Sequence, residues 1–148
     1  MARKDFAFHH QFRVRWSETD AQGVVFNARY LDYADIGITE YWRATEWRKH
    51  HPDEPFEFHV RKAEVLFEAP IMPDEMIEVM ARTTKVGNSS MTQLVELHGA
   101  HEDGRDDLRA TIELVSVHVD LETHRPIALP DWIGKIFADF DAGKGGVK

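Results

Sequence analysis

The 148-residue chain contains no cysteine. It therefore has no structural disulfide, no thiolate nucleophile and no zinc site built on thiolate ligands. Long apolar runs are missing as well, since none approaches the roughly 20 residues that span a bilayer. The opening segment MARKDFAFHH lacks the apolar stretch of a secretory signal. From these absences we expect a cytoplasmic protein with no membrane partner.

Basic residues are also in short supply. The chain has 18 Lys and Arg against 26 Asp and Glu, which gives a formal net charge of −8. Domains that bind nucleic acid are usually basic, because they neutralise phosphates. We therefore expect no nucleic-acid partner.

Several catalytic motifs are absent too. There is no H-E-x-x-H, no G-x-S-x-G and no Gly-rich phosphate loop. Among the nine histidines, His9–His10 and His50–His51 are adjacent pairs, poorly placed to share one ion. An extended backbone would put His98 and His101 on opposite faces. We expect no metal.

The apolar pattern predicts an α+β domain. Alternation around Val14 predicts a strand over residues 12–17, and spacings of three and four predict a long helix over 28–47, with Asn27 as its N-cap. Gly37, inside that helix, suggests close packing against a sheet. Further strands are expected at 63–69, 76–86, 91–101 and 108–121, followed by a short helix after Pro130.

The arrangement of these elements indicates one domain over residues 1–148. The ordered core is expected at about 8–141, with a flexible tail at 142–148. Over 112–119 both faces of the last strand are apolar, which predicts a central strand covered on both sides. One helix on one face of a curled sheet would leave apolar positions open, and dimerisation would cover them.

The segment Trp16–Tyr33, WSETDAQGVVFNARYLDY, is the most informative part of the chain. It places Asp20 in a tight loop just before the long helix, where backbone N–H groups are unpaired and positively polarised. A carboxylate beside such donors suits attack on a carbonyl group, which needs a nucleophile or base and an oxyanion site. Taken alone, an Asp near a Gly is more simply a turn residue. Glu18 is the competing carboxylate, with a solvated loop charge as its simpler interpretation.

Three segments carry a resemblance to a known family: TDAQGVVFNARYL, KAEVLFEAPIMPDEMIEV and KVGNSSMTQLVEL. In this order they resemble the hot-dog fold acyl-CoA thioesterases of the 4-hydroxybenzoyl-CoA thioesterase type. The resemblance implies an α+β hot-dog fold, in which a curled five-stranded antiparallel sheet wraps a long central helix. It also implies a homodimer or homotetramer with joined sheets and an active site at the interface. The implied reaction is hydrolysis of an acyl-CoA thioester without any cofactor.

The resemblance assigns roles to individual residues. Asp20 falls on the catalytic carboxylate, as general base or nucleophile, and the backbone N–H groups of Gly23 and Asn27 fall on the oxyanion site. Asn27 departs from the family, which often carries Tyr or His there. The substrate-binding candidates are Phe26, Tyr30, Ser89 and Ser90. The candidates for the coenzyme A phosphates are Arg61, Lys62, Arg82 and Lys85.

Each of these assignments has a simpler alternative, and so does the activity. The aromatic residues would serve core packing, the serines a turn, and the basic residues a solvated surface. Enoyl-thioester hydration, on the same fold, pairs the Asp with a nearby His, and no His lies between Asp20 and Lys49. The remaining alternatives are a non-catalytic protein that binds acyl thioesters and a thioesterase acting on acyl-carrier protein. The net charge of −8 disfavours docking of an acidic carrier protein.

Overall fold

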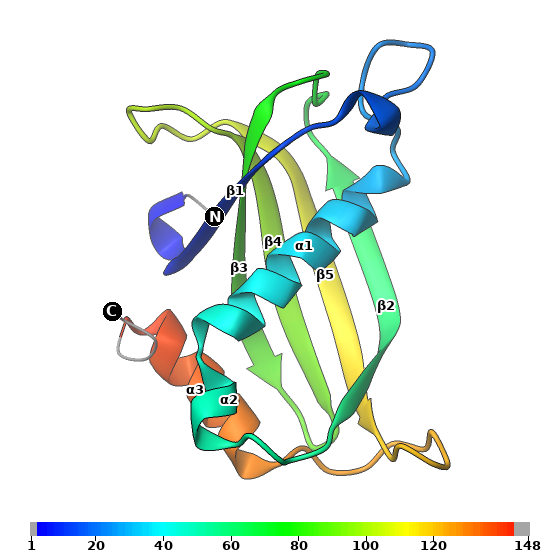
Figure 1. The fold of residues 1–148 in the computed structure, drawn as a ribbon, viewed down its shortest axis with the longest axis vertical. Helices are drawn as coiled ribbons and strands as arrows, with labels where there is room; N and C mark the ends of the chain where they lie inside the picture. The colour runs from blue at the N-terminus through cyan, green and yellow to red at the C-terminus, as the bar shows by residue number, and fades with distance from the viewer. Residues whose placement is uncertain (1–2, 144–148) are drawn as a thin grey trace.

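The computed structural model describes residues 3–143, so most of the tail expected to be flexible, 142–148, lies outside the described residues. Five strands and three α-helices follow one another along the chain (Figure 1). In chain order they are β1 (Phe8–Arg13), α1 (Arg29–Ala44), α2 (Trp47–His50), β2 (Glu57–Phe67), β3 (Met76–Val86), β4 (Ser90–Gly99), β5 (Leu108–Val119) and α3 (Asp131–Asp141).

The strands form one antiparallel sheet in the order β1-β3-β4-β5-β2. The long helix α1 runs obliquely across one face of this curved sheet, and α3 lies at one end of it (Figure 1). This confirms the predicted five-stranded antiparallel sheet around one long helix. Among the described residues, no helix is both long and apolar enough to cross a membrane.

The core lies between α1 and the sheet. From α1, Tyr33, Ala34 and Tyr41 are at most 1% exposed. Gly37 lies against β3 so closely that a β-carbon there would collide with the Val79 side chain. The helix therefore approaches the sheet over its glycine, as the sequence predicted.

The first strand lies four residues earlier than predicted. In its ladder with β3, Phe8 pairs with Ala81 and Arg13 with Met76, the first residue of β3. Beyond Arg13 the partner strand has ended: the Val14 N–H still donates to the Glu75 carbonyl (2.9 Å), but the strand ladder does not continue. Residues Trp16–Glu18 form a short 3-10 helix instead.

The long helix is shorter than predicted. It begins at Arg29 with Ala28 as its N-cap, so Asn27 is not the N-cap that we predicted. It ends at Ala44, and the left-handed backbone of Glu46 (φ 57°) then turns the chain into the separate helix α2. The predicted start near residue 28 is confirmed to within one residue, whereas the predicted end at 47 was wrong because a second helix begins there.

β2 and β5 also differ from the predicted strands. β2 begins at Glu57, well before the predicted residue 63, because Glu57 already pairs with Val119 of β5. β5 is an internal strand, between β4 and β2, as predicted. However, the helices lie on one side of the sheet, so β5 is not covered by helices on both faces (Figure 1).

Candidate active site

The loop around Asp20 is closed by its own hydrogen bonds. The Asp20 N–H donates to the Val24 carbonyl (2.9 Å), and the Gln22 N–H donates to the Asp20 carboxylate (2.8 Å). Gly23 sits at the left-handed position of the turn, with φ 78°, a conformation that glycine adopts without steric cost. The carboxylate stays partly exposed. It is held in place and remains open to a ligand.

The loop is also anchored to the rest of the fold. Thr19 and Val25 form an isolated antiparallel bridge. The Val25 N–H donates to the Ile71 carbonyl (2.8 Å), and the Phe26 N–H donates to the Glu18 carbonyl (3.0 Å). The segment between Asp20 and α1 is therefore fixed at several points.

The two candidate oxyanion donors differ in availability. The Gly23 N–H already donates to the Asp20 carbonyl at 3.0 Å, so in this conformation it is not available to a substrate. Within residues 3–143, no acceptor is bonded to the Asn27 N–H or to the Ala28 N–H. These are the unpaired donors expected at the start of a helix. Of the two candidate donors, only the backbone N–H of Asn27 is therefore free to bind an oxyanion.

Glu18 is buried, at 7% exposure, and is not the solvated loop charge that we expected. Its carboxylate accepts hydrogen bonds from the Tyr33 hydroxyl (2.8 Å) and from the Arg15 N–H (2.9 Å) and Nε (3.0 Å). Burial works against its ionisation, but these bonds outweigh it and hold the pKa of Glu18 below its usual range. Glu18 thus anchors the loop to α1, and it points to Tyr33 rather than to a substrate.

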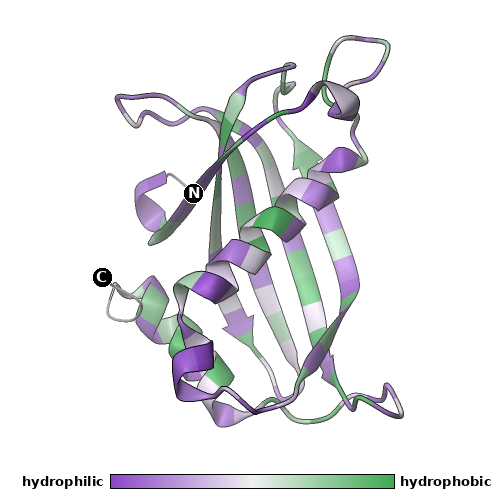
Figure 2. Ribbon diagram, in the orientation of Figure 1, coloured by the Kyte–Doolittle hydropathy of each residue, from purple (hydrophilic) through white to green (hydrophobic). Residues whose placement is uncertain are grey.

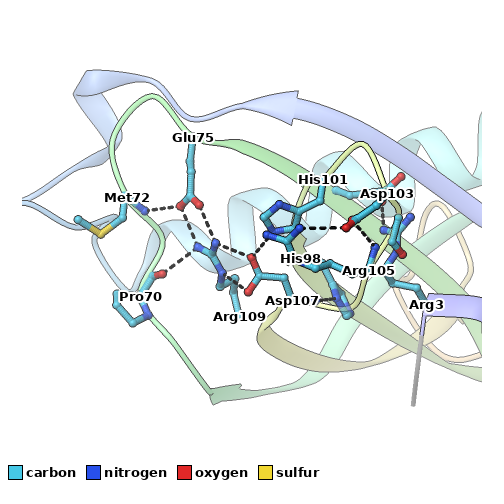
Figure 3. A network of polar contacts seen from close by, with 12 residues as sticks. Arg3, Pro70, Met72, Glu75, His98, His101, Asp103, Arg105, Asp107 and Arg109 are labelled. Atoms are coloured by element: carbon cyan, nitrogen blue, oxygen red, sulfur yellow. Dashed lines mark hydrogen bonds and ion pairs between the residues drawn. The ribbon is translucent and has the colours of Figure 1, made fainter.

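A second set of polar contacts fixes residues 70–75, the segment whose Ile71 carbonyl accepts the Val25 N–H (Figure 3). The buried Arg109 guanidinium of β5 donates to the Pro70 carbonyl (3.0 Å) and makes a bidentate pair with Glu75 (2.8 and 2.6 Å). Glu75 also accepts from the Met72 N–H (2.9 Å). Residues 70–75 are therefore tied to β5 on one side and to the Asp20 loop on the other.

The same network continues through Asp107, which accepts from Arg109 Nε (3.1 Å) and Nη2 (2.9 Å). His98 accepts the Asp107 N–H at Nδ1 (3.0 Å), and His101 Nε2 lies 2.7 Å from the Asp107 carboxylate. The expected placement of His98 and His101 on opposite faces was wrong. β4 ends at Gly99, so His101 lies beyond the extended backbone.

The aromatic candidates have different surroundings. Tyr30 is buried, and its ring contacts Phe67 of β2 edge-to-face (4.9 Å), so it packs in the core. Phe26, beside the Asp20 loop, is 48% exposed. Only Phe26 of the two presents its ring to a ligand.

Ser89 and Ser90 lie at the opposite end of the sheet from Asp20. The Asp20 loop is bonded to Ile71 through Val25, and Ile71 lies just before Met76, the first residue of β3. The serines instead follow Val86, the last residue of β3. An 11-residue strand is about 33 Å long at 3.3 Å per residue. Within one chain these serines are therefore not brought to the carboxylate.

The four basic candidates do not form one patch in a single chain. Arg61 and Lys62 are on the edge strand β2, whereas Arg82 and Lys85 are on β3. In the sheet, β5 and β4 separate these two strands. One chain could offer either pair to a phosphate group, but not all four residues.

The two groups that hold the loop, the Arg15–Glu18 pair and Arg109, were not identified from the sequence. Each of them leaves only a weak pattern in the sequence. Arg15 and Glu18 have the i, i+3 spacing of a capping box. Arg109 is a cation at the second position of β5, two residues after Asp107. Their partners Tyr33 and Glu75 are distant in sequence, so the pattern alone could not pair them.

Comparisons with known proteins identify the family of the chain. Residues 14–137 match the family model described as the thioesterase-like superfamily. The acyl-CoA thioester hydrolase YbgC of Escherichia coli O6:H1 is 31% identical over 124 residues, which cover 83% of this chain and 90% of that protein.

Solved structures share the fold. A thioesterase from Thermus thermophilus, complexed with coenzyme A and zinc, has a TM-score of 0.75 at 26% identity, covering 94% of this chain and 98% of its own. A mutant 4-hydroxybenzoyl-CoA thioesterase complexed with 4-hydroxybenzoyl-CoA has a TM-score of 0.76 over 88% of this chain and 97% of its own. At 15% identity this second likeness concerns the fold alone. The chain therefore belongs to the thioesterase-like superfamily, and with its hot-dog fold it is a thioester hydrolase.

Proposed function

We propose that the protein hydrolyses an acyl-CoA thioester to the free acid and coenzyme A, with Asp20 as the catalytic carboxylate. One observation carries the proposal: Asp20 is held in a pinned loop that leads, through Phe26, to the unpaired Asn27 N–H at the start of α1. The activity named for the Escherichia coli relative and the coenzyme A bound to the Thermus structure support the substrate class.

Two routes fit this arrangement. As general base, Asp20 takes a proton from water, whose oxygen attacks the thioester carbonyl. As nucleophile, Asp20 forms a mixed anhydride that water then hydrolyses. In both, the C–S bond breaks, the thiolate takes up a proton, and the Asn27 N–H stabilises the oxyanion. An oxyanion donor of this kind contributes about 3–4 kcal/mol.

The proposal includes a dimer formed through β2. This strand is an edge of the sheet, and Val60 and Phe67 on it are 61% and 54% exposed. Figure 2 shows apolar bands along α1, and Leu31 of this helix is 44% exposed and lines a pocket together with Val60 of β2. Pairing two such edges antiparallel completes the ladder and covers these side chains. A homotetramer would join two of these dimers.

The dimer accounts for the placement of the remaining candidates. A two-fold axis reverses the partner, so the partner's Ser89–Ser90 end comes to the same end of the molecule as Asp20. Arg61 and Lys62 on β2 then lie beside the interface, as candidates for the coenzyme A phosphates. Phe26 is the candidate for contact with the acyl group. We propose no cofactor and a cytoplasmic location.

The test measures thiol release from benzoyl-, short-chain and long-chain acyl-CoA, comparing wild type with Asp20→Asn. The matched control is Asp32→Asn, which removes an exposed carboxylate from the first turn of α1. We expect wild type and the control to turn over alike, and Asp20→Asn to lose at least a hundredfold in rate. Circular dichroism would verify that all three proteins are folded.

The other outcomes are equally informative. If Asp20→Asn keeps its rate, the assignment of the catalytic carboxylate is wrong. If wild type binds an acyl-CoA but cleaves none of the panel, a non-catalytic binding protein is the better interpretation. If acyl-carrier-protein thioesters alone are cleaved, the proposed carrier is wrong while the reaction stands.

A further inference from the structure

A glutamate and a histidine share the outer face of β2 at the start of this strand. Glu57 and His59 are two residues apart, so their side chains point to the same side of the sheet. Between them, Phe58 packs against Trp42 of α1, with ring centroids 5.7 Å apart. Glu57 and His59 therefore point away from α1, into solvent.

The turn after β5 brings a second histidine to the same place. Glu57 pairs with Val119, the last residue of β5, so the turn that follows lies beside the start of β2. Asp120 organises this turn: its carboxylate accepts the N–H groups of Glu122 and Thr123, both at 2.9 Å. His124 has a left-handed backbone with φ 60°, a conformation that costs a non-glycine residue energy. The turn holds the His124 ring at the β2 edge in spite of this cost.

The three side chains converge. His59 Nε2 lies 2.6 Å from Glu57 Oε2, and His124 Nδ1 lies 3.8 Å from the same oxygen. The two imidazole rings stack at 5.3 Å with 28° between their planes. One ligand atom from each residue lies within 4.8 Å of the other two. Zn²⁺ bonds of about 2.0–2.2 Å place tetrahedral ligand atoms roughly 3.4 Å apart, which exposed side chains can reach by small rotations.

We propose that Glu57, His59 and His124 form a binding site for a divalent transition-metal ion, with Zn²⁺ as the expected ion. Two imidazole nitrogens and one carboxylate oxygen form a ligand set that Zn²⁺ accepts, whereas Mg²⁺ and Ca²⁺ favour oxygen ligands alone. Water completes the coordination on the solvent side. The ion links the turn after β5 to the edge strand.

This site is separate from the Asp20 loop. Glu57 begins β2, whereas Phe67 at the other end of β2 contacts Tyr30 beside the loop. Within one chain the metal site therefore lies at the end of β2 away from Asp20. The absence of metal expected from the sequence rested on histidines that are neighbours in the chain, and His59 and His124 are not.

Isothermal titration calorimetry of Zn²⁺ into the full-length, tag-free protein, stripped of metal beforehand, tests the site. We expect one ion per chain and at least a tenfold weaker affinity in His59→Ala, His124→Ala and Glu57→Gln. Two exposed residues provide matched controls: His50→Ala, away from the cluster, and Glu122→Gln, in the same turn. Both should bind Zn²⁺ as wild type does, and Mg²⁺ should give no binding to any variant.

Thermal unfolding supplies a second readout. The metal-free variants should melt like metal-free wild type, because all three side chains are at least partly exposed. Zn²⁺ should raise the melting temperature of wild type and the controls but not that of the double variant His59→Ala/His124→Ala. No binding by wild type, or unchanged binding by the double variant, would overturn the proposal.

Discussion

At the scale of single residues, Glu18 shows how burial changes the role of a carboxylate. Two residues from Asp20, it is nearly inaccessible and accepts three hydrogen bonds. Among the described residues, the Asp20 carboxylate accepts one hydrogen bond, from the Gln22 N–H, and it remains partly exposed. Two carboxylates in one short segment thus have different surroundings, and only Asp20 is left open for the catalytic role that we propose for it.

Replacing Gly37 by alanine has two opposing effects on stability, a gain in helix propensity and a loss from overpacking. Gly37→Ala should favour the helix by about 1 kcal/mol. The added methyl group would collide with Val79, however, and overpacking typically costs about 1–3 kcal/mol. We therefore expect a net loss of stability of about 1 kcal/mol, measured by urea unfolding. Thr39→Ala, at an exposed position of the same helix, should not destabilise. A more stable Gly37→Ala protein would contradict the close packing.

At the scale of elements, contacts between distant segments hold the Asp20 loop in position. β5 supplies Arg109, Arg109 holds residues 70–75, and the Ile71 carbonyl receives Val25. At the far end of α1, Asp141 of α3 accepts the Tyr41 hydroxyl (2.7 Å) and the Thr83 N–H of β3 (2.9 Å). Each end of α1 is thus fixed by polar contacts to other elements.

The Arg109 network makes stability depend on pH. Hydrogen bonds from Arg109 lower the pKa of Asp107 to about 2 and hold the pKa of Glu75 below its usual range. Groups with lowered pKa values stabilise the fold above their ordinary pKa, and this contribution is lost as the pH falls through the lowered value. The contribution of the network should therefore be complete above about pH 5 and disappear toward about pH 2.

Arg109→Met isolates this contribution. At pH 7 we expect a loss of about 2–4 kcal/mol in unfolding free energy, because two partly buried carboxylates lose their partner. The difference from wild type should shrink as the pH falls from 5 to 2. Arg105→Met provides the control, since its pair with Asp103 is exposed and worth little. A difference that stays constant with pH would show that Arg109 acts through packing alone.

At the scale of the whole molecule, the edge of the sheet formed by β2 exposes unpaired backbone groups and apolar side chains. β2 has a partner on one side only, β5, and carries exposed apolar side chains. A pocket of about 270 Å³ lies between this strand and α1, lined in part by Leu31, Ile38 and Val60. An edge of this kind tends to pair with another chain.

Val60→Lys tests the proposed dimer. A charged group at the centre of the edge would be desolvated on pairing, so we expect this variant to be monomeric by light scattering. Because the proposed site draws residues from both chains, thioesterase activity should fall with the loss of the dimer. Val86→Lys, at another exposed valine outside the edge strand, should leave the mass unchanged. A Val60→Lys protein with the wild-type mass would exclude this edge as the interface.

The sequence by itself determined the kinds of element and the location of the key segment. Residues 76–86 alternate in a way that specifies a strand with no knowledge of its neighbours, and β3 has those bounds. The stripe of apolar residues in α1 and the Asp-Gly loop before it are equally local signals. Hydrophobic periodicity and turn chemistry act over a few residues, so they can be read along the chain.

Only the tertiary structure decided which groups are free, buried or adjacent. It showed that the Gly23 N–H is occupied while the Asn27 N–H is open, and that Glu18 is enclosed. It separated Ser89 and Ser90 from Asp20 within the chain, and it brought His124 to Glu57 and His59. These outcomes depend on strand order and register, which join residues far apart in the sequence. No local pattern encodes such pairings, because burial and hydrogen bonding are settled by whatever the rest of the chain packs against them.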